Sequence, residues 1–157
     1  MKHYIFYTSF AILLISSKLC QAQATLLIKN KNYEGVTFNE KSSYPFFSKK
    51  KRFIPDLKEI VTMEEKLRLS IKKLVSLYKG YVSAECKIVK HLSIYKRQYF
   101  GYFENGEKII FTSFIFTKSN DWKRNIVFAE GGGCNFFKLK YASNKKTFYD
   151  LSINTPE

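Results

Sequence analysis

The stretch that decides the fold is YKRQYFGYFENGEKIIFTSFIF, which runs from Tyr95 to Phe116. Aromatic and β-branched residues fill both halves of it, and Glu104-Asn105-Gly106-Glu107 separates the halves. Because Asn and Gly tolerate the positive φ angles of a type I′ turn, the pattern predicts a β-hairpin.

The second half of this hairpin is apolar on both faces. Its two alternating sets are Ile109, Phe111 and Ile115 on one face and Ile110, Phe114 and Phe116 on the other. A strand of this kind belongs in the middle of a sheet that is covered on both sides. We expect a helix on one side, and on the other either the aromatic-rich segment that precedes the helix or a partner.

The C-terminal half as a whole predicts an antiparallel meander. Strands are expected near Tyr95–Phe103, Lys108–Thr117, Arg124–Ala129, Cys134–Tyr141 and Thr147–Ile153. Their connections are short, and one of them is the flexible hairpin turn or bulge Gly131-Gly132-Gly133, so neighbours in sequence should pair in space. In the last strand, alternation places Tyr149, Leu151 and Ile153 on one face.

One long amphipathic helix is predicted at about 57–78. Asp56 and Glu59 have the spacing of a capping box at its start, and Thr62 with Glu65 offers a second box at which the helix could begin or bend instead. Gly80 is expected to end it in a left-handed conformation. A short second helix is predicted at about 84–92, with a strand as the open alternative. The predicted fold class is therefore α+β, with both helices packed on a four- to five-stranded antiparallel meander.

The first 24 residues have the features of an export signal. Lys2 and His3 precede an apolar run from Tyr4 to Ile15, and Ala22-Gln23-Ala24 has the small-x-small pattern that signal peptidase prefers. The run is short for a membrane span, so we expect cleavage, with no transmembrane span afterwards. The predicted organisation is a signal peptide at 1–24, an N-terminal extended segment at 25–55 and an α+β domain at 56–157. Attachment of a lipid at Cys20 is the alternative localisation.

The chain is strongly basic, with 27 Lys and Arg against 13 Asp and Glu and a formal net charge of +14. After export such a charge suits an acidic protein or an anionic envelope surface, and no nucleic acid is expected as partner. The residues Lys96, Arg97 and Gln98 are the most conspicuous polar side chains of the central hairpin, and they form the predicted interaction surface. Cys86 and Cys134 remain after cleavage, and they are either paired in a disulfide or buried separately.

No motif in the sequence names a reaction. His91 is the one histidine left after cleavage, the two cysteines lack metal-ligand spacing, and Glu64-Glu65 sit side by side on the helix without facing each other. Gly131-Gly132-Gly133 lacks the Gly-Lys-Ser/Thr of a phosphate loop. We therefore predict no catalytic, cofactor-binding or metal-binding residues and no cofactor.

At Tyr95–Lys108 and again at Trp122–Asn154, the chain resembles small uncharacterised exported proteins of Bacteroidota. These proteins carry a Tyr-Arg-Gln-Tyr-x-Gly strand, a Gly-Glu-Lys hairpin, a Gly-Gly-x-Cys turn and a closing strand with Tyr-x-Leu. The matching residues are Tyr95, Arg97, Gln98, Tyr99, Gly101, Gly106, Glu107, Lys108, Trp122, Lys123, Gly132, Gly133, Cys134, Phe136, Tyr149 and Leu151. The resemblance implies a lineage and no activity.

The order of a long helix followed by an antiparallel meander is also similar to the cystatin or nuclear-transport-factor-like architecture. This likeness concerns the fold alone. The Gln-x-Val-x-Gly inhibitory loop is missing, since Gln98-Tyr99-Phe100-Gly101 is one residue short and lacks the Val. Protease inhibition is therefore not implied.

These observations predict a small exported, non-enzymatic binding protein. An inhibitor or immunity-type protein that blocks a secreted enzyme is the first alternative, and an enzyme is the second. A concave pocket that gathers several titratable residues would contradict the non-enzymatic prediction.

Overall fold

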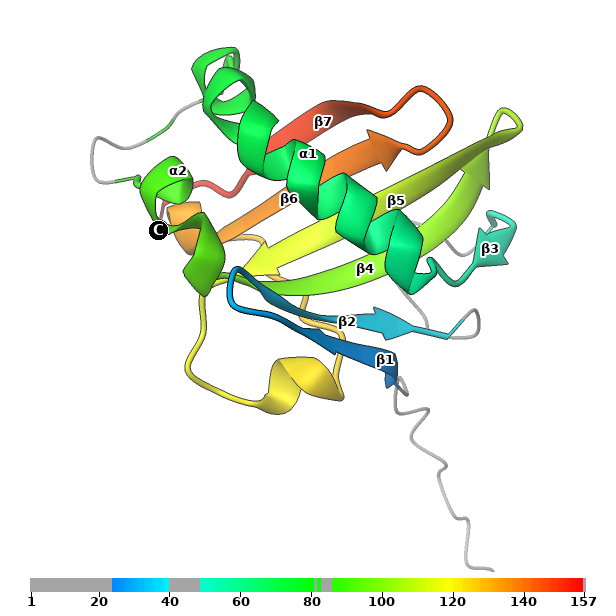
Figure 1. The fold of residues 1–157 in the computed structure, drawn as a ribbon. Coiled ribbons are helices and arrows are strands. Elements are labelled where there is room, and N and C mark those ends of the chain that lie inside the picture. The colour runs from blue at the N-terminus through cyan, green and yellow to red at the C-terminus, as the bar shows by residue number, and fades with distance from the viewer. Residues whose placement is uncertain (1–23, 40–48, 81, 83–85, 157) are drawn as a thin grey trace, which may run out of the picture.

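A computed structural model of the chain describes residues 24–39, 49–80, 82 and 86–156 (Figure 1). The predicted signal peptide, apart from Ala24 at its end, lies outside the described residues, as do Cys20 and the first residues of the predicted second helix. Within them, one long helix and one short helix pack on a mostly antiparallel sheet. The predicted α+β class is confirmed.

The sheet has seven strands in the described residues, and six of them follow the order β1-β2-β4-β5-β6-β7. Their bounds are β1 Ala24–Lys29, β2 Glu34–Phe38, β3 Arg52–Phe53, β4 Lys96–Glu104, β5 Glu107–Ile115, β6 Phe136–Ala142 and β7 Thr147–Ile153. The meander β4 to β7 is antiparallel throughout, while β2 lies parallel to β4 and the short β3 pairs with the far end of β4. The sheet is therefore larger than predicted, because the segment 25–55 contributes strands to it.

The central hairpin forms as its turn predicts. Glu104 pairs with Glu107, and the two residues between them have positive φ angles, 51° at Asn105 and 78° at Gly106. At the β1 edge of the sheet, Asn30 shapes the turn between β1 and β2, since its side-chain oxygen accepts hydrogen bonds from the backbone N–H of Asn32 and Tyr33.

The helix α1 spans Leu57–Ser76 and begins with the predicted capping box, in which Asp56 and Glu59 each accept a hydrogen bond from the other's backbone N–H. Its end differs from the prediction. Leu77 caps it in a right-handed conformation, and Gly80 is not among the glycines with positive φ. The Tyr78 ring lies against Gly80, so close that a β-carbon there would stand 2.4 Å from it. A side chain at that position would therefore require the Tyr78 ring to move.

The helix α2 spans Ile88–His91 and continues as a short 3-10 turn, η2, over Leu92–Ile94. Ile88 and Leu92 are buried, so one side of the segment is anchored in the core. Cys86, just before it, forms a disulfide with Cys134, whose Cα atom lies 5.6 Å away. The disulfide thus fixes the residues just before α2 to the residues just before β6.

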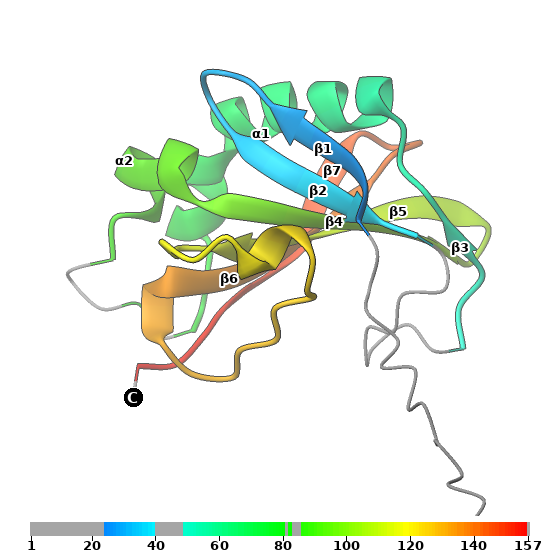
Figure 2. The same cartoon turned by 90° about the horizontal axis from the view of Figure 1, so that it is seen from below.

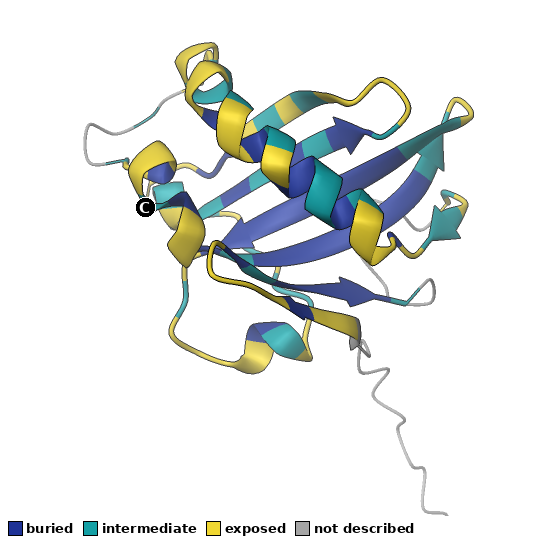
Figure 3. Cartoon of the chain, in the orientation of Figure 1, coloured by how far each residue is buried: buried dark blue, intermediate teal, exposed yellow. Residues whose placement is uncertain are grey.

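The two faces of the sheet are covered by different segments (Figure 2). On one face α1 buries Ile60, Met63, Leu67 and Ile71 against the strands. On the other face the segment between β5 and β6 packs Trp122 against a cluster that contains Phe100 and other sheet residues. The middle strands are buried as the two-sided apolar pattern of β5 predicts (Figure 3).

The strand predicted at Arg124–Ala129 is wrong. This segment has no regular secondary structure after a 3-10 turn, η3, at Asp121–Lys123. Its backbone groups form hydrogen bonds with side chains of the sheet and the C-terminal segment, and not with a neighbouring strand. Gln98 bonds the backbone of Trp122, Asn125 and Val127, and Asn154 bonds that of Ala129 and Gly131. The glycines that follow lead into a 3-10 turn, η4, at Gly133–Asn135, and so they do not form a hairpin.

The predicted alternation of β7 is also wrong, because its register shifts in the middle of its pairing with β6. Asp150 has a φ angle of 55° and marks this β-bulge. Tyr149 therefore packs with the Trp122 cluster, whereas Leu151 and Ile153 pack on the helix side. One inserted residue reverses the face of all side chains beyond it.

Candidate functional site

A pocket of about 620 Å³ opens between α1, the turn joining β1 and β2, and the α2–η2 segment. We call it the α1–α2 pocket. Three elements that are distant in sequence form its walls, because the sheet places β2 beside β4 and α1 packs on the same face of the sheet. The floor and the rim differ in chemistry.

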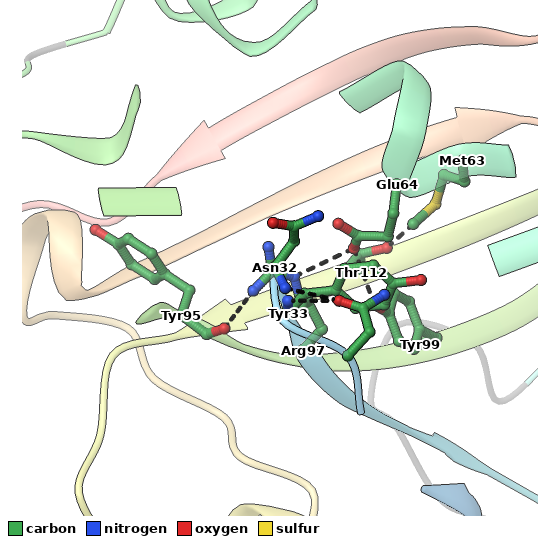
Figure 4. A network of polar contacts seen from close by, with 9 residues as sticks. Asn32, Tyr33, Met63, Glu64, Tyr95, Arg97, Tyr99 and Thr112 are labelled. Carbon is green, nitrogen blue, oxygen red and sulfur yellow. Dashed lines mark hydrogen bonds and ion pairs between the residues drawn. The ribbon is translucent and has the colours of Figure 1, made fainter. Parts of the chain in front are cut away.

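The floor is a buried ion pair between Arg97 of β4 and Glu64 of α1 (Figure 4). Arg97 Nε donates to Glu64 Oε1 at 3.2 Å, and the Tyr99 hydroxyl donates to the same oxygen at 2.9 Å. Arg97 also donates through a second nitrogen to the carbonyl oxygen of Tyr95. Since Arg97 is 1% and Glu64 5% exposed, each charge depends on the other for its stability away from water.

Aromatic rings surround this pair. The Arg97 guanidinium lies 5.4 Å from the centre of the Tyr33 ring and 5.5 Å from that of Phe114. Burial, followed by the negative charge of Glu64, raises the pKa of Tyr99 well above its usual value and raises that of Tyr33 in the same direction. Both phenols therefore keep their protons at neutral pH, and Tyr99 serves as a hydrogen-bond donor.

The rim of the pocket is basic and partly apolar. Arg68 and Lys72 stand on the outer side of α1, and Lys90 stands on α2. Leu69, which is 82% exposed, and Val89 lie among them. Glu65 is the acidic residue of the rim, so exposed cations outnumber exposed carboxylates around the opening.

The structure separates the residues of the predicted interaction surface. Arg97 forms the pocket floor, while Gln98 is fully buried on the opposite face, beneath the segment that follows β5. Lys96 is partly exposed and bonds Glu34 at 2.7 Å. Successive residues of a strand point to opposite faces, which is why neighbours in sequence have unrelated surroundings.

Glu64, Tyr33 and the rim cations were not predicted as site residues. Glu64 is 33 residues from Arg97 in sequence, so nothing local connects the two residues. The one signal for it is that Glu64 lies between Ile60 and Leu67 at helical spacing, on the face that packs on the sheet.

The predicted disulfide residues lie beside a second, smaller hollow. Cys134, together with Lys87, His91, Ile94 and Phe116, lines this hollow of about 280 Å³. Because Cys86 and Cys134 are joined, neither offers a thiolate. His91 is partly buried here and faces the hollow from α2.

The described residues contain no cluster of side chains that could bind a metal ion. Within residues 24–39, 49–80, 82 and 86–156, no three His, Cys, Asp or Glu side chains gather as a metal would require. Across the same ranges, no helix has both the length and the apolar character that a membrane crossing demands. Comparison of the chain with protein-family models, curated proteins and solved structures gave no significant match.

Proposed function

We propose that the protein is a small exported, non-enzymatic binding module whose α1–α2 pocket receives an acidic segment of another protein. The observation that carries this proposal is the charge arrangement of the pocket. Arg68, Lys72 and Lys90 surround an opening whose floor carboxylate is already held by Arg97 and Tyr99. The cations of the rim are therefore the groups that a ligand meets first.

Export is supported by two features of the chain. Residues 1–24 have the pattern of a cleavable signal, and the Cys86–Cys134 disulfide is of the kind that persists in oxidising compartments. A lipid at Cys20 would hold the same domain at a membrane and would leave the binding role unchanged.

A protein partner fits the pocket better than a flat anionic envelope surface does. The opening is concave, and Leu69 and Val89 offer apolar contacts between the cations. Side chains that project from a partner can enter such a hollow, whereas lipid headgroups on a plane reach mainly its rim.

An enzyme is the second candidate, because the pocket gathers the titratable residues Tyr33, Glu64 and Glu65 along with its cations. We rank it below binding because Arg97 and Tyr99 both bond Glu64 Oε1, which directs that carboxylate toward holding α1 on the sheet. If the protein were an enzyme that modifies its partner, incubation of the two proteins would change the mass of the partner.

The test is affinity capture from envelope extracts with the mature protein, followed by reconstitution with the purified partner. We expect one acidic protein to bind at equal stoichiometry, and Arg68→Glu with Lys72→Glu to weaken binding by about tenfold or more. Lys118→Glu with Lys146→Glu is the matched control, since both lysines are exposed and neither lines the α1–α2 pocket.

Other outcomes separate the alternatives. Loss of the captured partner's own enzymatic activity would identify an inhibitor or immunity-type protein. A changed mass of the partner after incubation would identify an enzyme. Equal binding by the two double variants, or retention of anionic lipid vesicles in place of a protein, would refute the pocket as the binding site.

A further inference from the structure

The segment Lys87–Ile94, which contains α2 and η2, separates the two hollows, and we call it the α2 ridge. Val89 and Lys90 line the α1–α2 pocket on one side of the ridge. Lys87, His91 and Ile94 line the smaller hollow on its other side. One short helical segment therefore contributes to both concave surfaces.

Large apolar side chains are exposed to solvent on both sides of the α2 ridge. Leu69 and Val89 are 82% and 42% exposed at the first hollow, and Ile94 and Phe116 are 46% and 45% exposed at the second. Single exposed apolar residues are normal on any protein. Four of them around one ridge, each beside a hollow, form the apolar centre that protein interfaces have.

The surrounding charge identifies the chemistry of the partner. Arg68, Lys72 and Lys90 border the first hollow, and Lys87 borders the second. Glu65 is the exposed carboxylate beside these cations, since Glu64 is buried in its pair with Arg97. A second copy of this chain would bring the same positive charge to the face, so an acidic partner is favoured over self-association.

The ridge is held at both of its ends. The disulfide joins Cys86 to Cys134 at one end, and at the other the Tyr95 hydroxyl donates to the Cys134 carbonyl oxygen at 2.6 Å. Ile88 and Leu92 are buried beneath it. A surface that is already fixed before binding loses little conformational entropy when a partner docks.

We infer that the α2 ridge is the centre of a docking face that an acidic protein straddles, with an apolar side chain in each hollow and carboxylates against the flanking cations. This inference rests on the proposed function, because it includes the α1–α2 pocket. It goes further by assigning the second hollow, with Ile94 and Phe116, to the same partner.

The test uses a defined probe, a fluorescent peptide of Glu and Leu residues in amphipathic helical order, with polyglutamate of equal charge as the second probe. We expect the amphipathic peptide to bind more tightly and to shift amide resonances on both sides of the ridge in the NMR spectrum. Ile94→Asp and Phe116→Asp should each weaken its binding by about tenfold. Leu57→Asp is the matched control, because Leu57 is 53% exposed at the start of α1 and contributes to neither hollow.

Several results would overturn the inference. The inference fails if Ile94→Asp weakens peptide binding no more than Leu57→Asp does. It also fails if polyglutamate binds as tightly as the amphipathic peptide. Preferential binding to phosphatidylglycerol vesicles, or dimerisation of the chain through the ridge, would overturn it as well. If Arg68→Glu with Lys72→Glu abolishes binding of the captured partner while Ile94→Asp and Phe116→Asp leave that binding intact, the proposed function stands and the docking face fails.

Discussion

Val127 donates its backbone N–H to the side-chain oxygen of Gln98 at 2.9 Å, so a residue inside the sheet holds the backbone of the segment that covers it. The Gln98 amide nitrogen donates to the carbonyl oxygens of Trp122 and Asn125 at 2.7 and 2.8 Å. One buried carboxamide thus does for this segment what a neighbouring strand does elsewhere in the sheet, and it keeps Trp122 on the core.

Replacement of this carboxamide should loosen the covering segment. Gln98→Leu leaves two carbonyl groups and one N–H without their partners, and we expect a loss of about 3 kcal/mol in the free energy of unfolding. Urea unfolding measures it, and Trp122 fluorescence should shift toward that of a solvated indole. Asn144→Ala, in the exposed turn between β6 and β7, is the control and should change stability little. Equal stability of the two variants would contradict the role of Gln98.

The Arg97–Glu64 pair allows a double-mutant test. Arg97→Met leaves the Glu64 carboxylate buried without its cation, and removal of one partner of a buried pair costs about 3–5 kcal/mol. Glu64→Gln in the same chain removes the stranded charge and keeps an acceptor for the Tyr99 hydroxyl. We expect the double variant to unfold at higher urea concentration than Arg97→Met alone. A double variant less stable than Arg97→Met would show that the two charges do not act as a pair.

The disulfide should contribute much of the stability of the α2 ridge. Cys86 and Cys134 are separated by 48 residues, and a closed loop of that length stabilises a fold by about 4 kcal/mol in the chain-entropy model. We expect Cys86→Ser with Cys134→Ser to lose that amount in urea unfolding, and reduction of the wild-type protein to give the same value. A reduced protein as stable as the oxidised one would contradict this prediction.

The free energy of unfolding should fall at acid pH, in part because Glu34 becomes protonated. The hydrogen bond from Lys96 holds the pKa of this carboxyl below its usual value of 4.5, with further help from Lys123 and against the effect of burial. Because the folded-state pKa is depressed, the stabilisation is present above pH 4.5 and is lost as the pH falls through the lowered pKa. Glu34→Gln should therefore flatten the decline of the urea midpoint between neutral and acid pH. Glu65→Gln, at an exposed position, is the control, and an unchanged decline in Glu34→Gln would contradict the assignment.

Two glycines should respond differently to alanine. At Gly101 a β-carbon would stand 2.5 Å from the Phe53 carbonyl oxygen, so Gly101→Ala must displace β3 and should cost about 2 kcal/mol. At Gly106 nothing lies within 4 Å, but the φ angle is 78°, and Gly106→Ala should cost about 1 kcal/mol. Thermal unfolding measures both. A larger loss at Gly106 than at Gly101 would contradict the close approach of β3 to β4.

The sequence by itself determined the local structure. Asn105-Gly106 specified the central turn, Asp56 and Glu59 specified the start of α1, and the two-sided apolar pattern of β5 specified a strand covered on both faces. These features depend on φ preferences, on capping and on periodicity, all of which act between residues that are close in the chain.

The tertiary structure decided which distant residues meet. The pairing of β2 with β4 sets the walls of the α1–α2 pocket, and Gln98 replaces a strand partner for the segment around Val127. A single inserted residue at Asp150 reversed the face of Tyr149 relative to the strand end. The site itself depends on Arg97 reaching Glu64 across the sheet–helix interface. Its composition could not be deduced from either segment alone, because the stability of a buried charge depends on a partner that only the folded chain brings near it.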